Sequence, residues 1–250
     1  MDHRRAREAD FHDQSFGQDT RKSLSAAYSI VDRCRSHFQQ YLFASCPGRK
    51  VLEYGCGRGS HSFLLADHGA REVVGIDISE VAVRMAGERA QAENRTNTSF
   101  QVMDCEQMEF ESESFDLICG TSILHHLNLT RAFKEITRVL KPNGSAAFIE
   151  PLAHHPALYL FRKLTPKFRT PDEHPLTMRD LRLIKSLFHD VNYRFFNLFT
   201  LLAVPFRKTK LFNQILNSTF KLDTVLFDHS RLFASLAWHV VMFLENPKTE

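Results

Sequence analysis

Three glycines alternate with other residues directly after a short apolar run, Lys50 to Tyr54. They are Gly55, Gly57 and Gly59, and a helical pattern begins at Ser60. A strand that feeds such a turn brings backbone N–H groups close to a ligand, because side chains there would obstruct it. A dinucleotide fingerprint needs glycine at the sixth position, where this chain has Ser60. The pattern therefore predicts a site for a nucleoside ligand without a diphosphate, with a tight turn that binds nothing as the alternative.

Two carboxylates follow the next two predicted strands. Asp77 lies near the end of the segment 72–78, where it can accept hydrogen bonds from both hydroxyls of a ribose. Asp104 follows the segment 99–103 and is placed to accept a hydrogen bond from the exocyclic amine of adenine. Either acid alone could be a cap or turn residue, although Ser79 is the better helix cap after Asp77. Two acids in phase after the glycine turn favour the ligand interpretation.

The elements that position these residues alternate between strands and helices. Short apolar runs predict strands at 50–54, 72–78, 99–103, 115–119 and 145–149, and three- and four-residue periodicity predicts helices at 20–44, 60–68, 80–93 and 131–140. Single helices between strands imply parallel pairing through right-handed crossovers. The predicted fold class is α/β, a doubly wound sheet with its ligand at the carboxyl ends of the strands.

The two ends of the chain are less regular. Residues 1–19 are polar and charged, and composition alone favours a frayed terminus. Residues 151–176 carry five prolines, which predicts an irregular or briefly helical excursion. A helix is expected at 177–188 with Thr177 as its N-cap, followed by strands at 191–201 and 238–244 with a Phe- and Leu-rich helical insert between them.

Composition narrows the class of protein further. The chain has 250 residues and 22 Phe, and 12 of these Phe lie in its last 100 residues. Net charge is −3 for residues 1–150 and +6 for residues 151–250. The five cysteines form no CxxC pair, which is typical of reduced thiols, and no apolar stretch is long enough to span a bilayer. We expect a cytoplasmic protein without stable membrane insertion.

The ordered motifs resemble those of class I S-adenosylmethionine-dependent methyltransferases, especially the group that includes quinone-biosynthesis and other small-molecule enzymes. The matching segments are 51–59, 75–79, 103–105, 115–120, 124–127 and 140–144. The resemblance implies a Rossmann-like methyltransferase fold, a seven-stranded and mostly parallel sheet whose last strand is antiparallel, with a C-terminal insert. It also implies an N-terminal helical lid at 1–46, a cofactor-binding core at 47–150, and a remainder at 151–250 of the same domain with a substrate-binding excursion. The segment from Ala9 to Asp13 resembles the lid of some members.

The same resemblance implies S-adenosyl-L-methionine as the cofactor. Glu53 would hold its methionine part, Asp77 its ribose and Asp104 its adenine. The implied cofactor-binding residues follow the strands and are Glu53, Gly55, Gly57, Asp77, Ile78, Asp104, Cys105 and Gly120. Gly120 would approach the methionine end from the fourth strand.

Catalysis of methyl transfer needs an aligned nucleophile and, for a hydroxyl, a general base. His125 is the first candidate base, and Glu150 is a second polar group expected beside the cleft. His126 could instead pack under the next helix. Tyr28 is a candidate aromatic contact for the sulfonium, although its spacing fits plain core packing equally. Related quinone enzymes hold a metal with acids in the loop where Ser122 and His125 stand here, so no metal is predicted.

The sequence favours methyl transfer to O, N or S of a small, largely apolar or aromatic metabolite, because the C-terminal Phe surplus falls where such enzymes vary their acceptor pocket. No nucleic-acid partner is expected, because the basic residues are scattered and no Asn/Asp-Pro-Pro-Tyr/Phe motif follows the fourth strand. Nucleic-acid or protein methylation, or a noncatalytic cofactor-binding regulator, remain alternatives. The oligomeric state is open.

Overall fold

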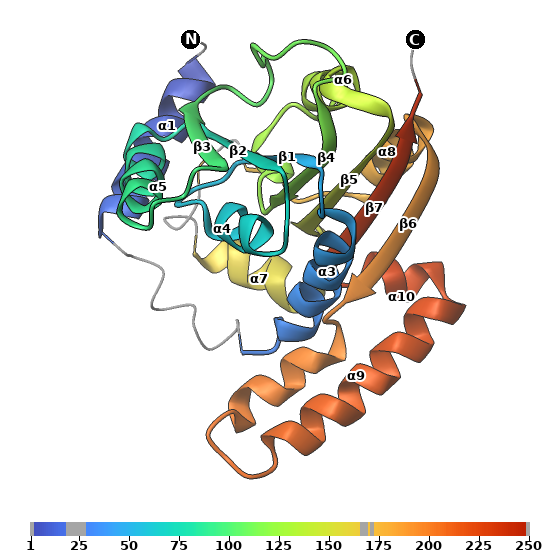
Figure 1. The fold of residues 1–250 in the computed structure, drawn as a ribbon. Coiled ribbons are helices and arrows are strands. Elements are labelled where there is room, and N and C mark those ends of the chain that lie inside the picture. The colour runs from blue at the N-terminus through green and yellow to red at the C-terminus, as the bar shows by residue number, and fades with distance from the viewer. Residues whose placement is uncertain (1–2, 19–28, 166–169, 171–172, 249–250) are drawn as a thin grey trace.

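The computed structural model describes residues 3–18, 29–165, 170 and 173–248. Its centre is one seven-stranded sheet in the order β3-β2-β1-β4-β5-β7-β6 (Figure 1). The strands are β1 Lys50–Tyr54, β2 Glu72–Asp77, β3 Thr98–Val102, β4 Phe115–Thr121, β5 Leu140–Pro151, β6 Phe188–Phe196 and β7 His239–Pro247. The first five strands pair in parallel, and β7 is antiparallel to both β5 and β6. The predicted fold class is confirmed.

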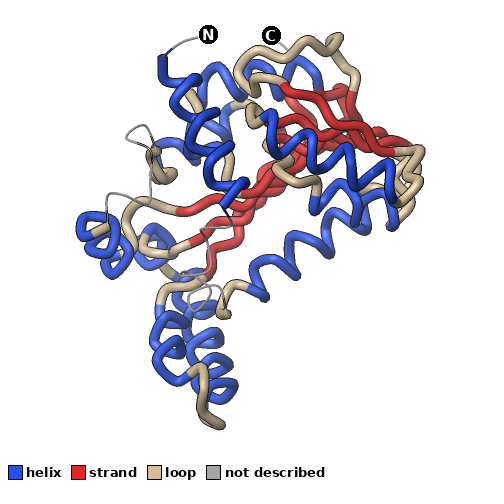
Figure 2. The backbone as a smooth tube through the Cα atoms, turned by 90° about the vertical axis from the view of Figure 1, so that its left-hand side faces the viewer, coloured by secondary structure: helices blue, strands red, loops and turns tan. Residues whose placement is uncertain are grey.

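Helices cover both sides of the sheet, as the tube view in Figure 2 shows. They are α1 His3–Gln18, α3 Asp32–Ser45, α4 Ser60–Asp67, α5 Glu80–Ala92, η2 Leu124–His126, α6 Leu129–Val139, α7 Pro156–Leu164, α8 Met178–Ser186, η4 Phe199–Phe206, α9 Phe212–His229 and α10 Arg231–Ser235. As predicted, Thr177 caps α8, and it forms a capping box with Asp180.

The two faces of the sheet have separate apolar cores because side chains alternate along each strand. On one face Val51 belongs to a cluster that includes Phe38 of α3 and Leu65 of α4. On the other face Leu52 belongs to a cluster with residues of α6 and α8, including Phe133. The strands of a sheet that helices cover on both faces are continuous apolar runs in the sequence. This pattern is what predicts β1. The alternation of side chains along each strand determines which residues pack against the helices on each face. The ends of the strands are then available for a site.

The helix boundaries differ from the sequence prediction at the N-terminus. Residues 3–18, expected to be frayed, form α1, which packs against α5. The helix expected at 20–44 begins at Asp32, and residues 20–28 of its predicted first part lie outside the described residues. Because Cys34, Phe38 and Leu42 are buried on the sheet, α3 is a core helix.

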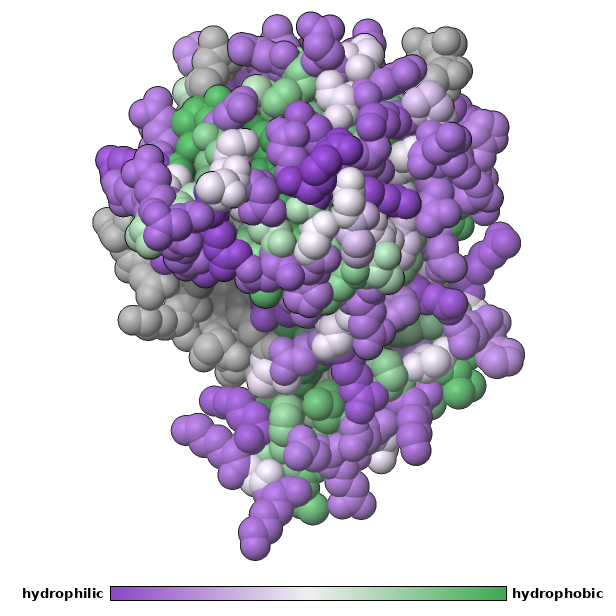
Figure 3. Space-filling view, in the orientation of Figure 1, coloured by the Kyte–Doolittle hydropathy of each residue, from purple (hydrophilic) through white to green (hydrophobic). Residues whose placement is uncertain are grey.

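The C-terminal insert forms a helical arm, η4 and α9, that projects below the sheet in Figure 1. Its large exposed apolar side chains give the green patches on the lower part of the surface in Figure 3. They include Leu202, Phe206, Leu211, Leu222 and Val225. Across the part of the chain that the structure describes, no helix is both long enough and apolar enough to cross a bilayer.

Candidate active site

A cavity of about 420 Å³ lies at the carboxyl ends of the first four strands, with α1 on its opposite side. Its size falls within the range of about 300–1,000 Å³ that is usual for small-molecule sites. The lining residues come from α1, α3, the end of β1 with the glycine turn and the start of α4, the ends of β2 and β4, and the segments that follow β2, β3 and β4: Arg4, Arg5, Glu8, His12, Arg35, Glu53, Gly55, Cys56, Gly57, Arg58, Ser60, His61, Asp77, Ile78, Asp104, Cys105, Glu106, Thr121, Ser122, Ile123, His126 and Leu127. Within the described residues, none beyond Leu127 lines it. The cavity therefore brings together seven of the eight predicted cofactor-binding residues, all except Gly120.

Glu53, at the end of β1, points to the start of α4. Its carboxylate accepts hydrogen bonds from the backbone N–H of Ser62 at 2.7 Å and of His61 at 3.3 Å, and also from the Ser62 hydroxyl. A carboxylate is favourable at a helix N-terminus because the first N–H groups have no partner within the helix. Glu53 is thus a buried, fixed acceptor on the cavity wall.

Asp77, at the end of β2, lies across the glycine turn. It accepts hydrogen bonds from the backbone N–H of Gly57 at 2.8 Å and of Ser79 at 3.0 Å. Each carboxylate oxygen has a second lone pair, so two acceptor positions remain. Burial raises the pKa of Asp77, and the two N–H bonds oppose that rise. Ser79 caps α5 through Ala82, so the capping alternative for Asp77 is not needed.

Asp104, after β3, is already engaged by α1. Its Oδ1 accepts the Glu106 N–H at 2.8 Å, and its Oδ2 lies 2.7 Å from Nη1 of Arg5. Cys105 is buried beside it, and burial together with the nearby acids raises the pKa of its thiol well above the ordinary value. This cysteine is therefore an inert wall residue, and Asp104 would have to share its carboxylate between Arg5 and any adenine amine.

Gly55 and Gly120 are required by packing inside the protein. Gly55 has φ +72°, and a Cβ there would lie 2.7 Å from a side-chain carbon of Ile123. At Gly120 a Cβ would lie 2.8 Å from the carbonyl oxygen of Tyr54. Gly120 is not among the lining residues. The close approach of β1 and β4 explains why this position needs glycine.

The two histidines after β4 contact each other, with ring centroids 4.2 Å apart, but of the two only His126 lines the cavity. His125 is buried outside the lining, with its Nδ1 2.7 Å from Oε2 of Glu150. The other oxygen of Glu150 accepts the N–H groups of Ile123 and Leu124, each at 2.8 Å. Glu150 and His125 thus hold the loop after β4 in shape and do not border the cavity. A positioning role fits them better than the direct catalytic role predicted for both. Tyr28 lies outside the described residues.

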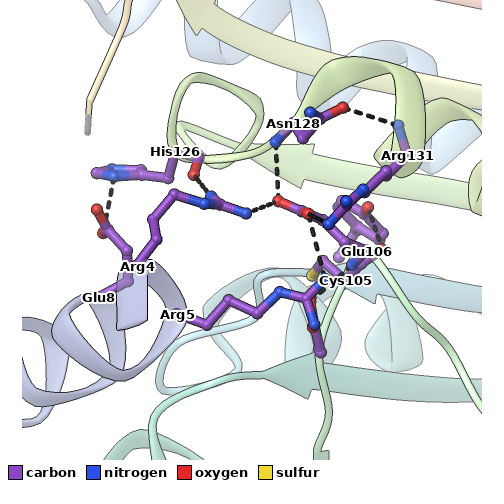
Figure 4. Close-up of polar contacts among 10 residues, drawn as sticks. Arg4, Arg5, Glu8, Cys105, Glu106, His126, Asn128 and Arg131 are labelled. Carbon is purple, nitrogen blue, oxygen red and sulfur yellow. Dashed lines mark hydrogen bonds and ion pairs between the residues drawn. The ribbon is translucent and has the colours of Figure 1, made fainter. Parts of the chain in front are cut away.

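α1 contributes residues that sequence reasoning missed. Arg4 donates to the carbonyl oxygen of His126 at 2.6 Å and pairs with Glu106, whose carboxylate is also approached by Arg5 (Figure 4). Glu8 and His12, one turn apart, lie against His126. The likeness of residues 9–13 to a lid was the signal that could have found them, but the polar composition favoured a frayed end.

Residues 51–144 match the family model described as a methyltransferase domain. The motif resemblance to methyltransferases is therefore confirmed for this segment of the chain. The chain is 36% identical over 99 residues to phosphoethanolamine N-methyltransferase 3 of Arabidopsis thaliana, covering 39% of this chain and 20% of that protein. It is 34% identical over 102 residues to a ubiquinone biosynthesis O-methyltransferase of Coxiella burnetii, covering 40% and 43%. The matches thus span less than half of either relative.

The fold extends the similarity beyond that segment. The solved structure of phosphoethanolamine N-methyltransferase 2 from Haemonchus contortus in complex with S-adenosyl-L-methionine aligns with a TM-score of 0.68 at 19% identity. The alignment covers 96% of this chain and 60% of that one. At this identity the alignment establishes a shared architecture and nothing finer.

Proposed function

We propose that this protein binds S-adenosyl-L-methionine in the described cavity and transfers its methyl group to an O, N or S atom of a small molecule. The observation that carries the proposal is the meeting of Glu53, Asp77 and the glycine turn on one cavity wall, within a methyltransferase domain. The cofactor has hydroxyl and amino donors that need acceptors, and these buried carboxylates are acceptors held in place.

The residues present fit that cofactor by an independent criterion. Asp77 keeps two acceptor lone pairs facing a cavity of suitable volume, and its fixed orientation comes from backbone N–H groups of Gly57 and Ser79. When bound, the cofactor supplies an electrophilic methyl group, so the protein has mainly to align a nucleophile and exclude water. Glu53 and Asp77 would orient the cofactor, and α1 would close the cavity over it.

The polarity of the cavity bears on the acceptor. The prediction of an apolar or aromatic substrate rested on the C-terminal Phe surplus, but the described lining contains no Phe. Many of these Phe pack in the cores or on the arm, as Phe188 and Phe206 illustrate. A polar acceptor is a second candidate, because the lining is rich in charged side chains of both signs, with four arginines and five acids. The relatives' acceptors, as their names give them, include both a phosphoamine and quinone precursors.

Labelled methyl transfer tests the function and separates the two acceptor classes. The purified full chain is incubated with methyl-labelled S-adenosyl-L-methionine and a metabolite extract, which is then divided into organic and aqueous phases. Label in the organic phase supports an apolar acceptor, and label in the aqueous small-molecule fraction supports a polar one. Label that disappears after nuclease or protease treatment would contradict a small-molecule acceptor. Cofactor binding without transfer into any fraction would favour the noncatalytic regulator.

A further inference from the structure

Three side chains that the proposed function leaves unused meet where α1 faces the loop after β4. Glu8 and His12 are four residues apart on α1, so they share one face of the helix. His126 belongs to η2, on the opposite side of the cavity mouth. One donor atom from each of the three lies within 4.8 Å of the others, and all three residues line the cavity. Two imidazoles and one carboxylate form a common set of ligands for first-row divalent metals.

The donor separations are suited to one ion. Oε2 of Glu8 lies 3.1 Å from Nδ1 of His126 and 3.6 Å from Nε2 of His12. Metal–ligand bonds of about 2.0–2.2 Å place neighbouring donors roughly 3 to 3.6 Å apart in tetrahedral or octahedral geometry. The carboxylate oxygen is therefore at ligand spacing from both imidazoles.

Two of these atoms are unsatisfied. Glu8 is 5% exposed and His126 is 8% exposed. Oε2 of Glu8 and Nδ1 of His126 lie 3.1 Å apart and form an ion pair when the imidazole is protonated, but neither atom meets hydrogen-bond geometry with a partner among the described residues. Buried polar atoms without well-aligned hydrogen bonds are costly and rare, and with a neutral imidazole a bound species that contacts both atoms would relieve that cost. A cation would satisfy both.

The surroundings hold the ligands in place. The Thr170 hydroxyl donates to the other oxygen of Glu8, and Arg4 donates to the backbone carbonyl of His126. Arg4 is itself paired with the buried carboxylate of Glu106 (Figure 4), so its charge is compensated next to the cluster. Such outer contacts orient metal ligands.

A neighbouring trio, His125, His126 and Glu173, also brings donors together. It is less suitable, because Nδ1 of His125 is already 2.7 Å from the carboxylate of Glu150. In the part of the chain that the structure describes, the Glu8 oxygen that faces the histidines contacts only His12 and His126.

We propose that Glu8, His12 and His126 bind a divalent first-row metal ion of the Zn²⁺ or Co²⁺ type at the mouth of the cavity. Two of the ligands come from α1, so the ion would also fix the lid to the loop after β4. Its chemical role rests on the proposed function: an acceptor hydroxyl bound to the ion releases its proton to solvent more readily, which leaves a nucleophilic oxygen for the methyl group. Metal binding itself does not depend on that role.

The test is titration of the chelator-treated full chain with Co²⁺ and Zn²⁺, followed by calorimetry and by the visible absorption of Co²⁺. The wild type is expected to bind one equivalent of either metal and to give a Co²⁺ absorption band of a low-coordinate N,O site. Glu8→Gln and His126→Gln are each expected to weaken binding by at least about tenfold. His154→Gln is the matched control, because His154 is exposed and belongs to neither trio. It should bind as the wild type does.

Several results would overturn the inference. They are the absence of metal binding by the wild type, unchanged affinity in Glu8→Gln and His126→Gln, or an equal loss in His154→Gln. If His126→Gln does not fold, His12→Gln on the partly exposed side of α1 provides the same comparison. Binding of S-adenosyl-L-methionine is measured on the same chelator-treated wild type. If cofactor binding persists where metal binding fails, only the metal inference falls; if the reverse holds, only the proposed function falls.

Discussion

The wall of the cavity formed by the sheet and the wall formed by α1 are built in different ways. On the sheet side, Glu53 and Asp77 are fixed by backbone N–H groups of neighbouring turns. On the α1 side, Arg4 and Arg5 reach across the cavity to carboxylates after β3. Backbone anchors form with the fold, whereas long side chains lose entropy when they pair and are screened by salt. The comparison indicates a sheet wall that is fixed by the fold itself and an α1 wall that is held by weaker, salt-sensitive contacts.

The largest effect is expected in the glycine turn of the sheet wall. Gly55→Val introduces a branched side chain at φ +72° and forces a contact at 2.7 Å with Ile123. Together, strain and overpacking should cost about 2–5 kcal/mol and abolish cofactor binding. Thermal unfolding measures the loss. Gly48→Val is the matched control, because Gly48 also has φ +72° but nothing within 4 Å of its added Cβ. Equal losses in both variants would attribute the effect to backbone strain alone.

The next effect concerns Asp77, the proposed ribose acceptor. Asp77→Ala should lower the affinity for S-adenosyl-L-methionine by roughly 10- to 100-fold, because hydrogen bonds to a charged acceptor contribute about 1.5–3 kcal/mol. Calorimetric titration and a thermal melt distinguish lost binding from lost folding. Asp67→Ala serves as the control, since Asp67 is exposed and does not line the cavity. An Asp77 variant with unaltered affinity would remove this residue from the ribose role.

The affinity for S-adenosyl-L-methionine should depend on pH through the same residue, Asp77. Burial raises the pKa of Asp77 above its ordinary value of 3.8. Binding needs the ionised form, so affinity should fall on acidification at a pH above that value. Stability responds in the opposite sense, because protonation relieves the cost of burying the charge. Asp77→Asn should flatten both profiles. An affinity that stays constant in the wild type down to pH 4 would exclude Asp77 as the acceptor.

The smallest effect is expected on the lid. Arg5→Ala frees Asp104 from the 2.7 Å ion pair, and an ion pair of this kind contributes about 0.2–1 kcal/mol. We therefore expect the affinity for S-adenosyl-L-methionine to rise about 1.4- to 5-fold. Salt should raise the affinity of the wild type and leave the variant unaffected. A loss of affinity in Arg5→Ala would mean that Arg5 helps to hold the cofactor instead of competing with it.

The sheet wall could be predicted from the sequence because its signals are local. Buried parallel strands read as apolar runs, and β1 was placed at Lys50–Tyr54 from such a run. The acids Asp77 and Asp104 follow their strands at fixed spacing, so the topology alone brings them to one edge.

The α1 wall could not be predicted because its partners are distant in sequence. Arg4 and Glu106 are 102 residues apart, and polarity alone gave no sign that α1 would pack. His125 likewise makes a tertiary contact, with Glu150. Neither of these two side chains is part of the cavity lining. For the same reason the C-terminal Phe could be counted but not assigned to core, arm or pocket.

Calorimetric titration of the full chain with S-adenosyl-L-methionine tests the central claim most directly. The account predicts saturable binding of one molecule per chain, clearly weakened in Asp77→Ala. A folded wild-type chain that takes up no S-adenosyl-L-methionine, or an Asp77→Ala variant that binds it equally well, would contradict the assignment of the cavity.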